Sequence, residues 1–369
     1  MYLDVFKTSL LFFPIVAFII TIPFILIEYH KYGSIHKFRT IIIYSFILYL
    51  MTIYFLVILP LPPLQDTAKM TGDRAQLVPF SFVLDFIHET PLIINDPSTY
   101  IKAICHSSFY TVIFNIFMTI PFGMYLRYYF KCDLKKTIKY SFVLSLFFEL
   151  TQLTGLYFIY PRPYRLFDVD DLMMNTLGGF IGFLIMGKLN KYLPTRDKID
   201  KDAIESSRVV SGLRRFTIFW IDSILFIIIY MLCFIILPKS EFMFYILFII
   251  YFVIIPYFWD GKTIGSNFVN VKFSFSGKRI IDLFIRAISP VIYFIFVPFV
   301  GMDFLIHYIL GSSVGEKIKI MLMLFGLLFV FIYYTVSVIF LFKNKGMLYD
   351  RLSKVKFVST LGSRDTKKD

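Results

Sequence analysis

The sequence predicts an all-α fold, a polytopic bundle of about nine transmembrane helices with the N-terminus outside and the C-terminus in the cytoplasm. The first observation is composition, because 58% of the 369 residues are hydrophobic and only 17% are charged. A soluble domain of this size needs a larger charged surface. The second is that many apolar runs are long enough to cross hydrocarbon, where the backbone must satisfy its own hydrogen bonds as a helix. The third is an alternation of charge along the connections.

The apolar runs define the predicted spans. They are residues 9–28, 40–60, 106–126, 139–159, 172–189, 216–237, 243–259, 283–302 and 319–342. The fifth and seventh are the shortest. The first run follows MYLDVFK, which is not a basic leader, and no small-residue cleavage site comes after it. We therefore expect a retained helix there and not a signal peptide.

The connections between the runs set the orientation. Segments 29–39, 127–139 and 188–215 and the stretch after 342 are rich in Lys and Arg, whereas 61–105 leans acidic. Loops 238–242 and 303–318 are nearly neutral. Cytoplasmic loops carry the excess of Lys and Arg, so the basic segments are expected inside. A multi-pass protein of the cell membrane follows.

The formal net charge of +13 has the same explanation. Cations confined to short connections act as orientation signals and headgroup contacts, so no nucleic-acid partner is predicted. The three cysteines lack CxxC spacing, and the histidines lack the spacing of metal ligands. No HExxH, GxSxG, P-loop or dinucleotide motif occurs in the sequence, so we expect neither an enzyme nor a metal or other cofactor.

The charged stretch NKYLPTRDKIDKDAIESSRVVSG divides the chain. We expect a five-helix membrane domain over 1–190, a solvated cytoplasmic linker over 191–212, a four-helix membrane domain over 213–358 and a basic tail over 359–369.

The acidic connection 61–105 contains LVPFSFVLDFIHE, which is too short to span a membrane. Phe80, Leu84 and Ile87 fall on one helical face, so an interfacial or re-entrant segment at the outer leaflet is one interpretation. A plain structured loop is the other.

Polar residues gather where the fourth and fifth spans meet the outer interface. The candidate ligand-binding residues are Asn115, Glu149, Gln152, Arg165, Asp168, Asp170, Asp171 and Asn175. Glu149 and Gln152 share a helix face, and Arg165 can pair with Glu149 or an aspartate. Such a set suits a headgroup, phosphate or sugar. For Asp170 and Asp171 the alternative is that they only complement a helix dipole.

These motifs carry a family resemblance. FNIFMTIPFG, SLFFELTQ and YRLFDVDDLMMNTLGG, over about 10–190, resemble the VanZ-like family of small membrane proteins. QLVPF, from Gln76 to Phe80, departs from the Asn-led version usual in the family. The resemblance implies a link to resistance against the glycopeptide teicoplanin.

The second half resembles the RDD family over about 208–358. Arg215, Asp222 and Asp350 occupy the positions of its arginine and two aspartates, on the inner face, and Thr263 and Gly265 match its glycine-threonine loop. Asn267 stands where a lysine is common. Either a buried ion pair that fixes helix packing or an ion or solute pathway through Asp222 explains the triad.

Three functions follow as hypotheses. The first is a non-enzymatic protein that confers resistance to teicoplanin-type antibiotics by binding a lipid-linked headgroup, or a lipid-anchored drug, at the outer leaflet. Its expected partners are membrane lipids, a lipid-linked cell-wall precursor and the lipoglycopeptide itself. The alternatives are a secondary transporter that uses Asp222 and a membrane enzyme acting on a lipid-linked substrate with Glu149 or Asp170 as acid or base.

Overall fold

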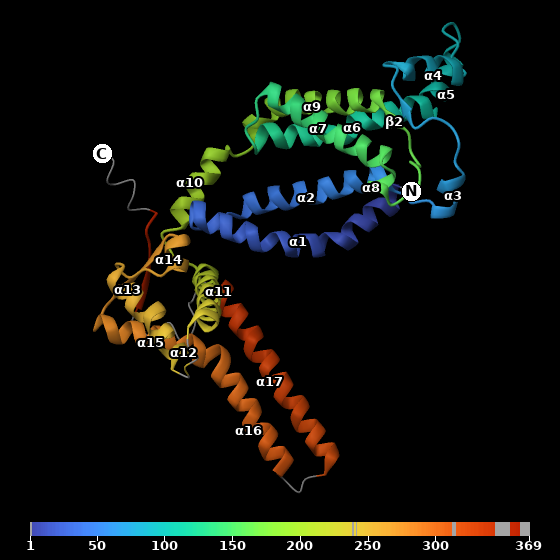
Figure 1. Ribbon diagram of the computed structural model, residues 1–369. Helices are drawn as coiled ribbons and strands as arrows, with labels where there is room; N and C mark the ends of the chain where they lie inside the picture. The colour runs from blue at the N-terminus through green and yellow to red at the C-terminus, as the bar shows by residue number, and fades with distance from the viewer. Residues whose placement is uncertain (1, 238–239, 241, 312–314, 344–354, 362–369) are drawn as a thin grey trace, which may run out of the picture. The chain divides into compact units, whose positions relative to one another are not determined.

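The structure is a computed structural model that describes residues 2–237, 240, 242–311, 315–343 and 355–361 (Figure 1). The described chain is mostly helical, as the sequence predicts, with two small two-stranded sheets in addition. It divides into two compact units. The first unit comprises Met1–Ile20 and Lys37–Ile199, and the second comprises Thr21–His36 and Asp200–Asp369. Helix α1 (Tyr2–Tyr32) therefore contributes to both units.

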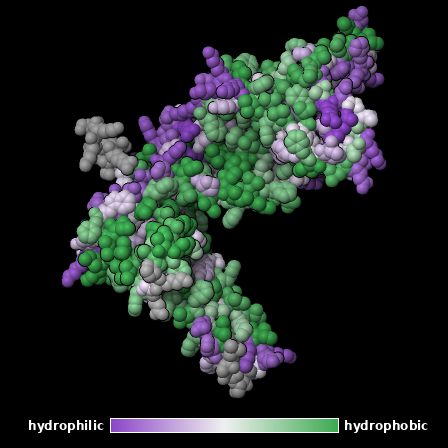
Figure 2. Space-filling view, viewed as in Figure 1, coloured by the Kyte–Doolittle hydropathy of each residue, from purple (hydrophilic) through white to green (hydrophobic). Residues whose placement is uncertain are grey.

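Within the described residues, seven helices are long and apolar enough to cross a membrane. They are Asp4–Tyr32, Lys37–Ile58, Ser107–Tyr128, Val169–Tyr192, Gly212–Ile236, Arg279–Tyr308 and Glu316–Phe342. The predicted span 139–159 falls instead on α7 (Leu134–Leu153), whose first turns carry three lysines, and 243–259 falls on the shorter apolar helix Met243–Phe258. The chain is thus a helical membrane protein, whereas nine spans and the orientation of the termini stay predictions. Figure 2 shows hydrophobic side chains over much of the long helices.

The first unit is built around close packing of α6 (Ser107–Tyr128) against α9 (Val169–Leu189). A Cβ added at Gly178 would lie 2.2 Å from the Ile116 carbonyl oxygen, and one at Gly182 would lie 2.0 Å from that of Ile120. Small residues let helix backbones approach this closely where water supplies no driving force. α2 (Lys37–Ile58) and α7 complete the helical part, and the short helices α8 (Gly155–Phe158) and η2 (Asn190–Tyr192) follow α7 and α9.

The acidic connection 61–105 is structured. It contains α3 (Leu64–Lys69), β1 (Ala75–Gln76), α4 (Ser81–Glu89), η1 (Pro97–Thr99) and α5 (Tyr100–Ile104). β1 pairs in parallel with β2 (Phe167–Asp168), which immediately precedes α9, and Gln76 lies opposite Asp168. Phe80, Leu84 and Ile87 keep 55 to 60% of their surface exposed. The connection therefore places one helix with an exposed apolar side at the start of α9.

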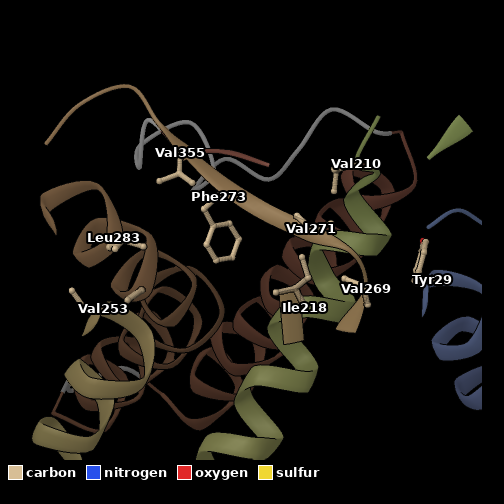
Figure 3. Packing of buried hydrophobic residues seen from close by; sticks show 10 residues of the cluster. Tyr29, Val210, Ile218, Val253, Val269, Val271, Phe273, Leu283 and Val355 are labelled. Carbon is tan, nitrogen blue, oxygen red and sulfur yellow. The ribbon is translucent and has the colours of Figure 1, made fainter. Parts of the chain in front are cut away.

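The second unit surrounds a small antiparallel sheet, which the sequence analysis did not predict. Its helical segments are α11 (Gly212–Ile236), α12 (Met243–Ile249), η3 (Ile250–Ile254), α13 (Ile255–Phe258), α14 (Ile264–Phe268), α15 (Arg279–Val291), η4 (Ile292–Phe296), α16 (Val297–Gly311) and α17 (Glu316–Phe342). β3 (Val271–Phe275) pairs with β4 (Val355–Ser359). Figure 3 shows Val271, Phe273 and Val355 directed into a buried cluster with Ile218 of α11 and Leu283 of α15.

The stretch 191–212, predicted as a solvated linker, contains helix α10 (Arg196–Ser206). Ile199, Ala203 and Ser207 recur every fourth residue and are at most 1% exposed. This spacing places the three on one helix side, which is buried, while the charged residues cover the rest. Ser359, the first residue of the predicted tail, is paired in the sheet, and residues 362–369 lie outside the described residues.

Candidate functional site

The start of α9 organises the polar residues of the first unit. Asp168 precedes the helix in an extended conformation, and its carboxylate accepts a hydrogen bond from the Asp170 amide at 2.8 Å. This is the N-cap interaction that the first turn of a helix requires. Capping is therefore the role of Asp168, whereas Asp170 and Asp171, for which the sequence left capping open, make contacts beyond their own helix.

Asp170 holds the N-terminus of α4. Its carboxylate accepts hydrogen bonds from the amides of Phe80 and Phe82, at 2.6 and 3.1 Å, and from the Ser81 hydroxyl at 2.9 Å. Asp170 is 2% exposed. α4 has no side-chain cap of its own, so this carboxylate supplies the charge and the acceptor that free N-terminal amides favour.

The next polar layer lies between α6, α7 and α9. The Asn115 amide donates to the Asp171 carboxylate, and the Asn175 amide donates to the Ser145 hydroxyl at 3.0 Å. Ser145 in turn donates to the Asp171 carbonyl at 3.3 Å. These contacts explain why Asn115, Asp171 and Asn175 occur inside apolar helices, since the amide nitrogens of both asparagines and the Asp171 carboxylate have hydrogen-bond partners.

Glu149 and Gln152 of α7 attach the same region to the chain before α9. The Glu149 carboxylate accepts from the Asp168 amide at 2.9 Å. With its amide nitrogen turned to face acceptors, Gln152 donates to the Leu166 carbonyl at 3.2 Å and to Glu149 at 3.3 Å. Both side chains are buried. From the shared helix face that their spacing predicts, both side chains thus contact the segment just before α9.

Arg165 does not complete the cluster in the way the sequence suggested. Its guanidinium donates to the Leu59 carbonyl at 2.5 Å, and it forms no ion pair with Glu149 or an aspartate in the described part of the chain. Backbone carbonyls at the end of α2 are strong acceptors, and they take the donors expected to neutralise the carboxylates.

A polar cavity of about 260 Å³ lies between α4, α6 and the start of α9. Its lining is formed by Ser81, Phe82, Asp85, Glu89, Ser107, Ser108, Thr111, Val112, Asp168, Asp170, Asp171 and Met174. Five of these residues carry a carboxylate and three are serines, and the described lining contains no Lys or Arg. Of the predicted residues, Asp168, Asp170 and Asp171 line the cavity. The predicted residues outside the lining include Asn115, Glu149, Gln152 and Asn175.

The sequence analysis missed Asp85, Glu89, Ser107, Ser108 and Thr111. Asp85 and Glu89 are four residues apart and share a side of α4, a spacing that was available in the sequence. Ser108 donates to the Glu89 carboxylate, which connects α4 with the first turn of α6. The sequence does not show which side of α4 packs against the start of α9. The hydrogen bonds from α4 to the Asp170 carboxylate fix that side.

Electrostatics in the cavity favour protonation of one carboxyl at unusually high pH. Burial raises the pKa of Asp168 above its usual 3.8, the hydrogen bond from the Asp170 amide opposes this shift, and the charges of Asp170 and Asp85 add to it. Within the described residues, no group of three or more His, Cys, Asp or Glu is placed to hold a metal ion.

Two residues of the predicted inner-face triad, Arg215 and Asp222, lie within the described residues. Asp222 is 2% exposed and accepts hydrogen bonds from the Thr263 hydroxyl at 2.6 Å, the Gly265 amide at 2.8 Å and the Tyr251 hydroxyl at 3.0 Å. It thus holds the first turn of α14. Asp222 and Arg215 line one cavity, and Asp350 lies outside the described residues.

Arg214, the neighbour of the predicted Arg215, is fully buried. It donates twice to the Val269 carbonyl, at 2.7 and 2.9 Å, and to the carbonyls of Asn270 and Ser207 at 2.9 Å. A guanidinium fork suits several carbonyls at fixed positions. In a sequence reading RRF, nothing distinguishes the arginine that points inward.

Part of the first unit is similar in sequence to known proteins. Residues 46–190 match the protein family described as VanZ/LLP1. The chain is also 35% identical over 96 residues to Protein VanZ of Enterococcus faecium, covering 26% of this chain and 54% of that protein. The chain thus spans about half the length of this curated relative. No solved structure matches it. The VanZ-like resemblance is confirmed over 46–190, and the RDD resemblance stays a prediction.

Proposed function

We propose that this membrane protein protects cells against teicoplanin-type glycopeptides by holding, in the acidic cavity of its first unit, the polar part of a lipid-anchored drug or of a lipid-linked cell-wall precursor. The similarity of residues 46–190 to VanZ supports the link to glycopeptide resistance. We choose this cavity as the site because five residues with carboxylates line it.

The charge of the cavity narrows the chemistry of its ligand. Five carboxylates without a facing cation in the described lining repel a phosphate and attract an ammonium group, and the three serines add hydrogen bonds for hydroxyls or amides. The ligand group is therefore an amine with neighbouring hydroxyls or amides, as in an amino sugar or an amine-bearing peptide. This replaces the phosphate that the sequence alone left open.

The surroundings of the cavity suit a ligand anchored in a lipid leaflet. Phe80, Leu84 and Ile87 give α4 an exposed apolar side, while Asp85 and Glu89 of the same helix line the cavity. An amphipathic helix of this kind lies at the boundary between headgroups and acyl chains. A molecule whose tail is in the bilayer can thus present its polar part to the cavity without leaving the membrane.

Neutralising the exposed carboxylates of α4 tests the proposal. Asp85→Asn with Glu89→Gln removes two charges at side chains that are exposed, so the fold should persist. We expect a glycopeptide-sensitive strain that expresses this variant to lose the protection against teicoplanin that the unmodified protein gives. The matched control is Asp66→Asn, an exposed carboxylate in α3 that lies outside the cavity lining.

The membrane level of each variant is measured by immunoblot, so that loss of protein is separated from loss of binding. Full protection by the double variant at normal protein level would remove the acidic cavity from the mechanism. Equal loss of protection in the Asp66→Asn control would show that the effect is not specific to the cavity.

We do not propose proton-coupled transport through Asp222. A carboxylate that accepts three hydrogen bonds and holds the α14 turn is arranged as a structural anchor. A transport group must change its protonation state within the cycle, and here that change would release Thr263 and Gly265.

A further inference from the structure

An apolar groove of about 460 Å³ lies on the first unit, between α2, α6 and α7. Phe46 of α2 connects its walls, because the centroid of that ring lies 6.1 Å from the Phe122 ring and 5.3 Å from the Phe130 ring. Tyr140 and Phe147 of α7 line the groove and are each 45% exposed. Every lining residue is aromatic or aliphatic. On helices that cross a membrane, the medium that fills such a groove is the acyl chain of a lipid.

The groove has a definite direction along these helices. Figure 1 shows α6 and α7 side by side, joined by the connection 129–133. α6 runs from Phe122 towards this connection, and α7 runs from Tyr140 to Phe147 away from it. Phe130 and Tyr140 therefore mark the end of the groove at the connection. At 1.5 Å per residue, the lining of α7 extends about 10 Å from that end.

The end of the groove at the connection is cationic. Residues 127–139 include five Lys and Arg and a single carboxylate, Asp133. Two of these cations have partners in or after α9, since Arg127 donates to a backbone carbonyl at 2.7 Å and Lys131 pairs with Asp197 at 2.6 Å. The other three are exposed lysines in the first turns of α7. Positive charge is thus in excess here among residues that the structure describes.

Two of these lysines, Lys136 and Lys139, continue the side of α7 that lines the groove. Lys136 precedes Tyr140 by four residues, and Lys139 precedes Val143 by four, so each lies next to a lining residue on the helix surface. Lys136 lies 3.9 Å from Asp133, with side chains 63 and 62% exposed, which is a weak pair. Lys139 makes no hydrogen bond or ion pair within the described residues. Both ammonium groups are therefore available where the groove begins.

We propose that this groove holds an acyl chain of an anionic phospholipid whose headgroup phosphate is bound by Lys136 and Lys139. The apolar lining selects a lipid over a soluble anion, and the excess of lysines selects a headgroup with net negative charge. The acidic cavity lies beside the first turns of α6 and this groove beside its last turns, and no residue lines both. The proposal does not depend on the one made for that cavity.

An engineered tryptophan provides the experiment. The two tryptophans of the chain, Trp220 and Trp259, are replaced by Phe, and Tyr140→Trp places one reporter in the groove lining. Phe142→Trp in the same background is the matched control, because Phe142 is two residues away, is 44% exposed and lies outside the lining. The full-length protein is reconstituted in phosphatidylcholine vesicles. Phosphatidylglycerol or phosphatidylcholine with brominated chains, which quench tryptophan fluorescence, is then added at increasing mole fraction.

The two reporters should respond differently to the brominated lipids. We expect brominated phosphatidylglycerol to quench the Tyr140→Trp protein with a relative affinity roughly fivefold above that of brominated phosphatidylcholine. The two lipids should quench the Phe142→Trp protein alike. The same preference for phosphatidylglycerol at both positions would overturn the proposal, because it would show only the attraction of anionic lipids to a basic surface.

Charge variants in the Tyr140→Trp background test the headgroup contact. Lys136→Gln with Lys139→Gln should abolish the preference, because both ammonium groups are lost. Lys188→Gln with Lys191→Gln is the matched control, since it removes two exposed cations near the end of α9 that lie outside the groove lining. Equal loss of preference in this control would also overturn the proposal. Gel filtration and circular dichroism compare the fold of each variant with its parent.

A groove variant keeps the test decisive if the lysine variants fail to fold. Val143→Phe adds apolar atoms to the lining at a position that is 50% exposed, and it leaves every lysine in place. It should reduce the preference for phosphatidylglycerol, because the acyl chain loses its place while the charge is unchanged. An undiminished preference in Val143→Phe would show that the groove does not hold the chain.

Discussion

Asp170→Ala should release α4 from the first unit without unfolding the unit. The substitution removes the acceptor for the Phe80 and Phe82 amides and for the Ser81 hydroxyl. Loss of an N-cap acceptor costs roughly 0.5–2 kcal/mol, and hydrogen bonds to a charged group contribute roughly 1.5–3 kcal/mol each. The released amides regain water, so the net loss is smaller than the sum, and about 2–4 kcal/mol of docking free energy is expected for the three bonds together.

Hydrogen exchange read by mass spectrometry measures this quantity directly. At 1.4 kcal/mol per factor of ten, amide exchange over residues 81–89 should accelerate roughly 30- to 700-fold. Exchange in α6 and α9 should change little, because their contact is made by the glycines and not by Asp170. Asp66→Ala, an acidic residue in the first turn of α3, is the control. Unchanged exchange over 81–89 in Asp170→Ala would refute the assignment of this carboxylate as the anchor of α4.

Three further predictions concern stability and pH. Gly182→Ala should lower the thermal unfolding midpoint of the purified protein by an amount equivalent to roughly 1–3 kcal/mol, because the new Cβ would press on the Ile120 carbonyl. Gly301→Ala is the control, with no described heavy atom within 4 Å of the added Cβ, and it should leave the midpoint unchanged or raise it. Arg214→Lys should destabilise the second unit by about 2–4 kcal/mol in the same assay, because an ammonium cannot serve the Val269, Asn270 and Ser207 carbonyls together, and Arg208→Lys at an exposed position is its control. The affinity of the acidic cavity for a cationic ligand, measured by calorimetry, should fall on acidification at a pH above the usual 3.8 of an aspartate, because the raised pKa of Asp168 lets it take up a proton early. The same shift means that Asp168 contributes less to folding stability as the pH rises through that window. Ligand affinity independent of pH there would contradict both expectations.

Much of the helical architecture was accessible from hydrophobicity alone. Seven of the nine predicted spans fall on helices that are long and apolar enough to cross a membrane, because long apolar runs leave the backbone no other option in lipid. The runs at 139–159 and 243–259 do not fall on such helices. The first shares its helix with lysines, and the second is interrupted by the π-helical turn Ile250–Ile254.

The candidate site was predicted only in part, for a physical reason. The aspartates of α9 were visible because ionised residues next to an apolar run are unusual. Their partners on α4 were not, because the pairing of Gln76 with Asp168 and the contact of Ser81 with Asp170 join segments about ninety residues apart, and no local pattern encodes that register. The guanidinium of Arg165 donates to the backbone carbonyl of Leu59, and no ion pair joins it to Glu149 or an aspartate within the described residues.

The pairing of β3 with β4 sets a condition on how the second unit is made. Val271 pairs with Ser359, and all of α15, α16 and α17 lie between the two strands in the chain. The strand that closes the sheet is therefore synthesised after these three helices. Until then the apolar side of β3 lacks the cover that Val355 and Phe357 supply, so the buried cluster of the second unit cannot be completed before the end of the chain is made.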